Sequence, residues 1–306
     1  MAGSPRYIVL ALLSALLMGG SFPVVVHAIR VCGVGSVLTT VYGVAALVTL
    51  VLVAGRHGMS SLLSVSLSVE FFTRAVLFLG QIVPLYVALA VVDRAFIGGV
   101  FLCFFVWPVL ALFYMQWLTK VKVVRELTLF VGASFMFVAL AVEFFEQGLV
   151  GLAMSRNVAA YGLALVAANS CALYTAVIRR FGCQGQGDVL TPIVCLLAAV
   201  GGVALSIGSP DTHVFSFSWP LVLIGGATGL AQVFWDTSVR RGDGIITSIL
   251  ACFTPWIAIF SASTMTGVVL VENIQESALL LALGLLSMGL VVVSPCPIGM
   301  DTQRSK

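Results

Sequence analysis

The stretch from Gln232 to Trp256 decides the fold: it reads Gln-Val-Phe-Trp-Asp236, then Thr-Ser-Val-Arg-Arg-Gly-Asp243, then an apolar run ending in Phe253-Thr-Pro-Trp256. Two long apolar segments meet here at a short basic turn, and a proline interrupts the second segment. Hydrocarbon cannot hydrogen-bond a polar side chain or a broken backbone. We therefore expect both features to face a cavity lined by protein.

The same arrangement occurs earlier in the chain, where Trp107-Pro108 interrupts another apolar run. A shift of 147 residues places Pro108 on Pro255 and Phe113 on Phe260. We interpret the chain as two copies of one half, 1–147 and 148–306, each with one broken helix. This organisation indicates a transporter rather than an enzyme.

Composition identifies the broad class. The chain has 306 residues, of which 60% are hydrophobic and 9% charged, with a mean hydropathy of +1.15. Soluble domains carry roughly 25% charged residues, so this sequence is that of a membrane protein. The net charge of +3 is too small and too dispersed to indicate a nucleic-acid partner. The seven cysteines form no CxxC pair and no Cys/His cluster, so we expect neither a metal site nor a disulfide framework.

Apolar runs of about 20 residues span a bilayer, and charged residues mark their ends. The first run follows a single arginine but is too long for a signal peptide, so we count it as a retained span. We predict ten spans, near 7–26, 33–54, 72–92, 95–118, 126–145, 158–178, 189–208, 219–239, 244–266 and 277–294. We place Glu70 and Arg74, before and within the third span, at the membrane interface.

The distribution of lysine and arginine predicts the topology. Of the fifteen cations, twelve fall on the side of the N-terminus, and the other side has Arg30, Arg94 and Arg156. Cations collect on the cytoplasmic face, so we expect both termini to be cytoplasmic in a plasma or inner membrane. Five spans per half is an odd number, which makes the two repeats inverted. Inverted repeats place a substrate site near the midplane, between the halves.

Depth in the bilayer, counted at about 1.5 Å per residue, selects candidate cavity residues. Polar and aromatic side chains on several spans fall near one depth, and each of them has an alternative interpretation as simple helix packing. The predicted substrate-binding residues are Met18, Gln81, Phe104, Phe105, Trp107, Asn169, Cys171, Gln232, Trp235 and Thr254. Pro108 and Pro255 are predicted gating kinks. Such walls suit a ligand with a large apolar body and a polar end.

Asp236 has two interpretations. An acid inside a span is a natural proton carrier. The alternative, which we favour, is an i,i+4 ion pair with Arg240 at the cytoplasmic edge. Tyr174 is interpreted as packing, and so is the spacing of Gly225 and Gly229, which favours close helix contact. We expect a monomer, with a dimer as the alternative.

Catalysis gains little support from the sequence. The three histidines fall in loops, and we find no Walker motif, HExxH or GxSxG sequence. We therefore predict no catalytic residue, no cofactor and no enzyme activity.

Several stretches of this sequence resemble a known family, the EamA group of the drug/metabolite transporter superfamily. Phe105-Val-Trp-Pro108 is similar to the Tyr-Leu-Trp-Pro element of the YddG-type aromatic amino acid exporters. The elements Phe234-Trp-Asp236, Arg240-Arg-Gly-Asp243 and Phe253-Thr-Pro255 resemble the signature of their eighth and ninth spans. The resemblance implies an inner-membrane exporter of aromatic amino acids or similar metabolites, working by alternating access. Its central cavity would be lined by spans one, three, four, six, eight and nine.

The chain departs from this family at several cavity positions. Phe104 stands where such exporters often have asparagine, and Met18 and Cys171 stand where they tend to have tryptophan. Gln81 replaces another polar group. The substrate therefore stays open, with a nucleotide sugar, a drug or an aromatic cation as alternatives. A nucleotide sugar would favour cations in the cavity, whereas lysine and arginine here lie at the span ends. A non-transporting membrane subunit or an intramembrane enzyme is a further alternative.

Overall fold

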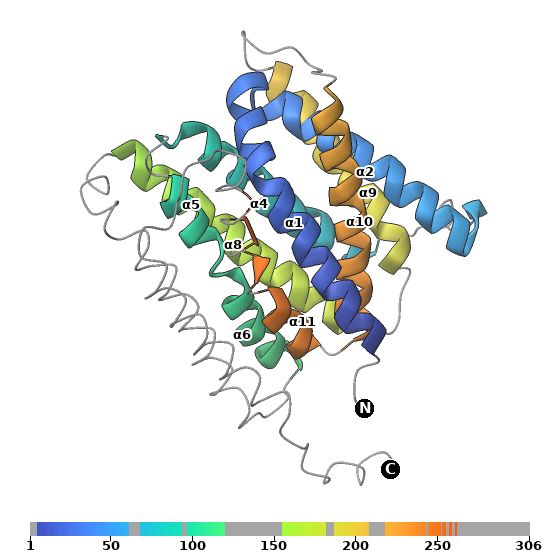
Figure 1. Cartoon of the computed structure of the whole chain (residues 1–306). Helices are drawn as coiled ribbons and strands as arrows, with labels where there is room; N and C mark the ends of the chain where they lie inside the picture. Colours follow the sequence, from blue (N-terminus) through green and yellow to red (C-terminus); the bar gives the residue numbers. More distant parts are fainter. Residues whose placement is uncertain are drawn as a thin grey trace, which may run out of the picture.

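The structure is a computed structural model, and it describes residues 5–60, 68–93, 97–119, 155–181, 187–207, 218–242, 244–251, 253–254, 257–258 and 261. Within these residues every regular element is a helix (Figure 1). The helices are α1 (Pro5–Cys32), α2 (Val34–His57), α4 (Val69–Val91), α5 (Ile97–Phe104), α6 (Trp107–Thr119), α8 (Ser155–Phe181), α9 (Gly187–Ile207), α10 (Trp219–Arg241) and α11 (Gly244–Ala251).

Five helical segments are long and apolar enough to cross a membrane: Pro5–Cys32, Val34–His57, Val69–Val91, Asn157–Phe181 and Val189–Ile207. They correspond to the predicted first, second, third, sixth and seventh spans, and within the described residues they agree with an all-α polytopic membrane protein. The predicted eighth span forms the continuous helix α10, which is not among these five. The predicted fifth and tenth spans lie outside the described residues, and so does part of the ninth.

Helix α4 begins before the predicted third span. Ser68 is its N-cap, and the Ser68 hydroxyl accepts a hydrogen bond of 3.2 Å from the Phe71 N–H. Such a cap satisfies one of the unpaired N–H groups of a helix start. Glu70 and Arg74 therefore lie within α4. The Arg74 side chain is 0% exposed and packed inside the helical bundle, and its predicted depth at the membrane interface stays a prediction.

The predicted interruption of the fourth span is confirmed. Helix α5 ends at Phe104, and α6 begins at Trp107 after a turn at Phe105 and Val106. Pro108 has no N–H, so the Phe104 carbonyl loses its ordinary intrahelical donor. Prolines inside α1, α4 and α9 do not end those helices.

The helices pack in pairs that are distant in sequence. Helix α2 lies along α9, α4 along α8, and α1 along α10 (Figure 1). Small residues bring α10 onto α2: a Cβ on Gly225 would lie 2.8 Å from the Val41 carbonyl oxygen, and one on Gly229 would lie 2.9 Å from that of Ala45. The predicted packing role of these two glycines is confirmed. The start of α1, the end of α10 and α11 lie at one end of the molecule (Figure 1).

Candidate functional site

A buried ion pair joins α4 to α10. Arg74 of α4 donates from Nη2 to Oδ2 of Asp236 on α10, at 2.7 Å, and the two side chains are 0% and 2% exposed. Arg74 Nη2 also lies 3.1 Å from the Tyr174 hydroxyl of α8. A charge-assisted bond of this length is among the strong hydrogen bonds of proteins.

The Asp236 carboxylate has further donors from two helices. The Thr191 hydroxyl of α9 donates to Oδ2 at 2.6 Å, and Gln232 Nε2, one turn before Asp236, donates to Oδ1 at 3.0 Å. Gln232 Nε2 also lies 3.2 Å from the Tyr174 hydroxyl. The network therefore ties together α4, α8, α9 and α10. Both carboxylate oxygens are hydrogen-bonded, which is the condition under which a buried charge is tolerated.

Two further charges extend this network. Glu70 Oε1 lies 3.8 Å from Arg74 Nη1 and 4.0 Å from Arg240 Nη2. Charges of opposite sign thus alternate from Asp236 through Arg74 and Glu70 to Arg240. This corrects the expected i,i+4 pair between Asp236 and Arg240. Asp236 is buried and binds Arg74 of another helix, a contact that spacing within α10 cannot indicate.

The predicted aromatic residues come together near the break between α5 and α6. Trp107 and Trp235, both 5% exposed, meet edge to face with ring centroids 5.3 Å apart. Phe104 and Phe105 pack on Phe22 of α1, at centroid distances of 6.2 and 5.7 Å. The contact of Trp107 with Trp235 joins the first predicted half to α10 of the second.

The remaining predicted site residues lie on α1, α4, α8 and the segment after α11. Gln81 and Asn169 are half-buried, and the Asn169 side-chain carbonyl accepts a hydrogen bond from the Tyr114 hydroxyl of α6. Met18 packs against the core and Cys171 lies within it. Thr254 is buried where α1 approaches closely, since a Cβ on Gly19 would lie 2.8 Å from its backbone oxygen. Pro108 is buried, and Pro255 lies outside the described residues.

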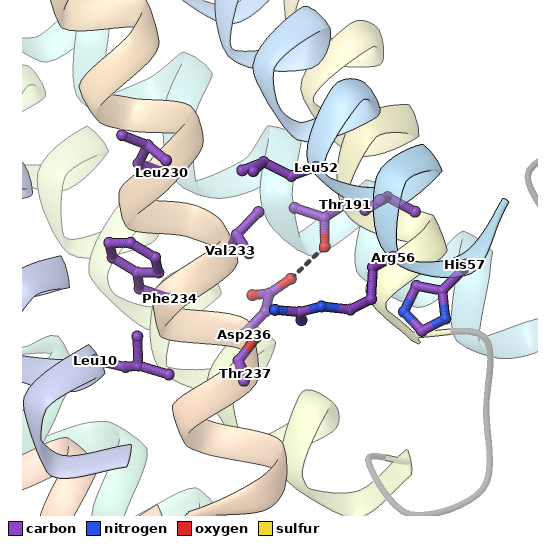
Figure 2. A pocket seen from close by; sticks show the side chains of 11 residues that line it. Leu10, Leu52, Arg56, His57, Thr191, Leu230, Val233, Phe234, Asp236 and Thr237 are labelled. Atoms are coloured by element: carbon purple, nitrogen blue, oxygen red, sulfur yellow. Dashed lines mark hydrogen bonds between the residues drawn. The ribbon is translucent and has the colours of Figure 1, made fainter. Parts of the chain in front are cut away.

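A pocket of about 240 Å³ has Asp236 among its lining residues (Figure 2). Its wall is mostly apolar, and Arg56 and His57 from the end of α2 add two basic side chains. The lining residues are Leu10, Leu52, Val53, Arg56, His57, Thr191, Leu230, Val233, Phe234, Asp236 and Thr237. Of the predicted site residues, Asp236 lines this pocket. The pocket lies between α1, α2, α9 and α10, away from the aromatic cluster at the broken helix.

Sequence reasoning missed Arg74, Thr191, Tyr174 and Phe22. The available signal for Arg74 was a cation inside an apolar run, which requires a buried acidic partner, and Asp236 is an acid inside another such run. Phe22 follows Met18 by four residues and so shares its helix face. Thr191 and Tyr174 gave no such signal, because hydroxyl groups are common in any helix.

Comparisons with known proteins give a fold but no family. No protein-family profile matches this chain, and no curated protein matches it. Eleven chains among solved structures match it. One is a crystal structure of a protein with a TM-score of 0.77 and 18% sequence identity, over 95% of this chain and 98% of that one. The two proteins share a fold.

Proposed function

We propose that this protein is a secondary transporter of the EamA type, which exports small metabolites by alternating access. The observation that carries the proposal is the broken helix between α5 and α6, where Trp107 of the first half meets Trp235 of the second. Broken helices at the contact between two repeats form the substrate sites of many transporters. A non-transporting subunit has no such need for an interrupted span.

Helix packing supports the ten-helix inverted repeat within this proposal. The repeat equates α1 with α8, α2 with α9, and α4 with α10. Under this exchange, the contact of α4 with α8 is equivalent to the contact of α10 with α1. The contact of α2 with α9 is its own equivalent. Both contacts are observed. The contact of α5 with α8 likewise becomes that of α11 with α1, which also occurs.

The substrate that these walls favour is an aromatic or other apolar amino acid. Phe104, Phe105 and Trp107 offer rings to an apolar body, and the half-buried amides of Gln81 and Asn169 offer hydrogen bonds to a polar end. Phosphate recognition would require cations near these rings. Arg74 is instead occupied by Asp236, so a nucleotide sugar is disfavoured.

The test is flux through purified protein in liposomes, measured with a panel of amino acids, nucleotide sugars and aromatic cations. We expect uptake of aromatic amino acids in preference to the other classes. Trp107→Ala should lower this uptake several-fold, since an aromatic contact contributes about 1 kcal/mol. Trp117→Ala is the matched control, because Trp117 lies on the same helix and is 68% exposed. Absence of flux for every class, in protein that remains folded, would refute the transporter assignment.

A further inference from the structure

Two arginines bind the ends of equivalent helices in the two halves. Arg30, near the end of α1, donates from Nη2 to the Val92 carbonyl just past α4, at 2.9 Å. Arg179, near the end of α8, donates from Nη1 to the carbonyls of Val239 and Arg240 at 3.0 and 3.2 Å. Arg179 Nη1 also donates to the Gly242 carbonyl at 2.7 Å.

The shift of 147 residues that superposes the prolines also superposes the bonded carbonyls, and Arg179 lies two residues beyond the position equivalent to Arg30. The shift places Val92 on Val239, so the bonded carbonyls are equivalent. In each half, an arginine near the end of the first helix binds the end of the third. Carbonyls at a helix end lack intrahelical donors and carry partial negative charge, which a guanidinium satisfies. Five spans separate the equivalent positions, so the two contacts belong to opposite membrane faces.

Each contact binds the chain where it leaves the helix that precedes α5 or α11. The chain leaves α4 at Val92 and enters α5, which breaks before Trp107. It leaves α10 at Gly242 and enters α11, which precedes Pro255. Residues near the start of α5 and of α11 are buried: Val100 of α5 is 0% exposed and Thr247 of α11 is 2% exposed. These two residues are also equivalent under the same shift.

We propose that Arg30 and Arg179 are reciprocal locks on the two gates of the transport cycle. Arg179 holds the α10–α11 corner closed at the face of the N-terminus, and Arg30 holds the α4–α5 corner closed at the opposite face. One lock releases while the other stays bonded, so the central site opens to one side at a time. This inference rests on the proposed transport function, but its test does not require transport.

The test places reporter cysteines behind each lock, as Val100→Cys and Thr247→Cys, in the full chain reconstituted in lipid nanodiscs. A water-soluble maleimide reaches both faces there, and mass spectrometry measures its reaction at each cysteine. Arg179→Met should raise the labelling rate at position 247 roughly tenfold or more and leave position 100 unchanged or slower. Arg30→Met should have the opposite effect. A tenfold change corresponds to the low end of what a hydrogen bond to a charged group contributes.

Controls separate a lock from a merely structural helix cap. Arg180→Met removes the same charge from the neighbouring exposed position of α8 and should change neither rate. Cys195, buried in the core, must stay unmodified in every variant, which shows that the bundle remains folded. Arg179→Lys and Arg30→Lys keep a donor and should restore slow labelling.

Equal acceleration at both reporters, or no acceleration at either, would overturn the proposal. Equal acceleration would mean that the two arginines only stabilise the bundle. No acceleration would mean that they cap helix ends without controlling access to the site. Flux without sided labelling leaves the transporter assignment standing and removes the locks. Sided labelling without flux for any solute tested keeps the two arginine contacts as sided closures and removes the transporter assignment.

Discussion

At the residue scale, Arg74 and Asp236 behave as one unit. Each is buried, and each compensates the other's charge at 2.7 Å. We expect Arg74→Met or Asp236→Leu alone to lower the free energy of unfolding by about 3–5 kcal/mol, because one buried charge is left unpaired. The double variant should recover most of this loss, since apolar residues replace both charges. Denaturant unfolding in detergent measures all three. Single variants as stable as the parent protein would contradict the ion pair.

Asp236 is also the candidate proton carrier of the sequence analysis. Its carboxylate is bonded to Arg74, Thr191 and Gln232, which leaves it a structural role. We therefore expect Asp236→Asn to destabilise the protein without changing how flux depends on a pH gradient. The comparison is Asp93→Asn, at an exposed position after α4. Loss of the gradient dependence in Asp236→Asn alone, with substrate exchange intact, would identify Asp236 as the proton carrier instead.

At the element scale, the break between α5 and α6 is the feature that the proposed mechanism requires. Pro108→Ala supplies an N–H to the Phe104 carbonyl and allows one continuous helix. We expect this variant to keep or gain thermal stability and to lose most of its flux, because the broken segment forms the substrate site. Pro192→Ala, at a proline that does not end α9, is the matched control. Full flux in Pro108→Ala would show that the break is dispensable.

Elements along the chain could be predicted, whereas contacts between them could not. Apolar length gives α1, α2, α4, α8 and α9, and a proline gives the break before α6, because both are local properties. The partner of Asp236 depends on which helix lies beside α10, and no spacing within α10 contains that information. The local i,i+4 rule therefore pointed to Arg240. The same limit applies to Phe22, whose contact with Phe104 joins α1 to α5.

At the scale of the whole molecule, charge asymmetry predicts a cytoplasmic N-terminus and an inverted second half. Val31, at the end of α1, and Met59, after α2, are 69% and 59% exposed and should lie on opposite faces. In intact cells, an impermeant thiol reagent should modify Val31→Cys and spare Met59→Cys. Permeabilised cells provide the control, because both should then react. Labelling of Met59→Cys alone in intact cells would reverse the topology.

The central claim is that one substrate site lies between the two halves, beside the broken helix. Its most direct test is substrate protection of Gln81→Cys on α4 and Asn169→Cys on α8, which come from different halves and are half-buried. Both cysteines should react with a water-soluble maleimide, and one aromatic amino acid should slow both reactions at the same concentration. Met59→Cys should react at an unchanged rate. If neither cysteine reacts, or if both react with no slowing by any transported solute, the site does not lie between the halves.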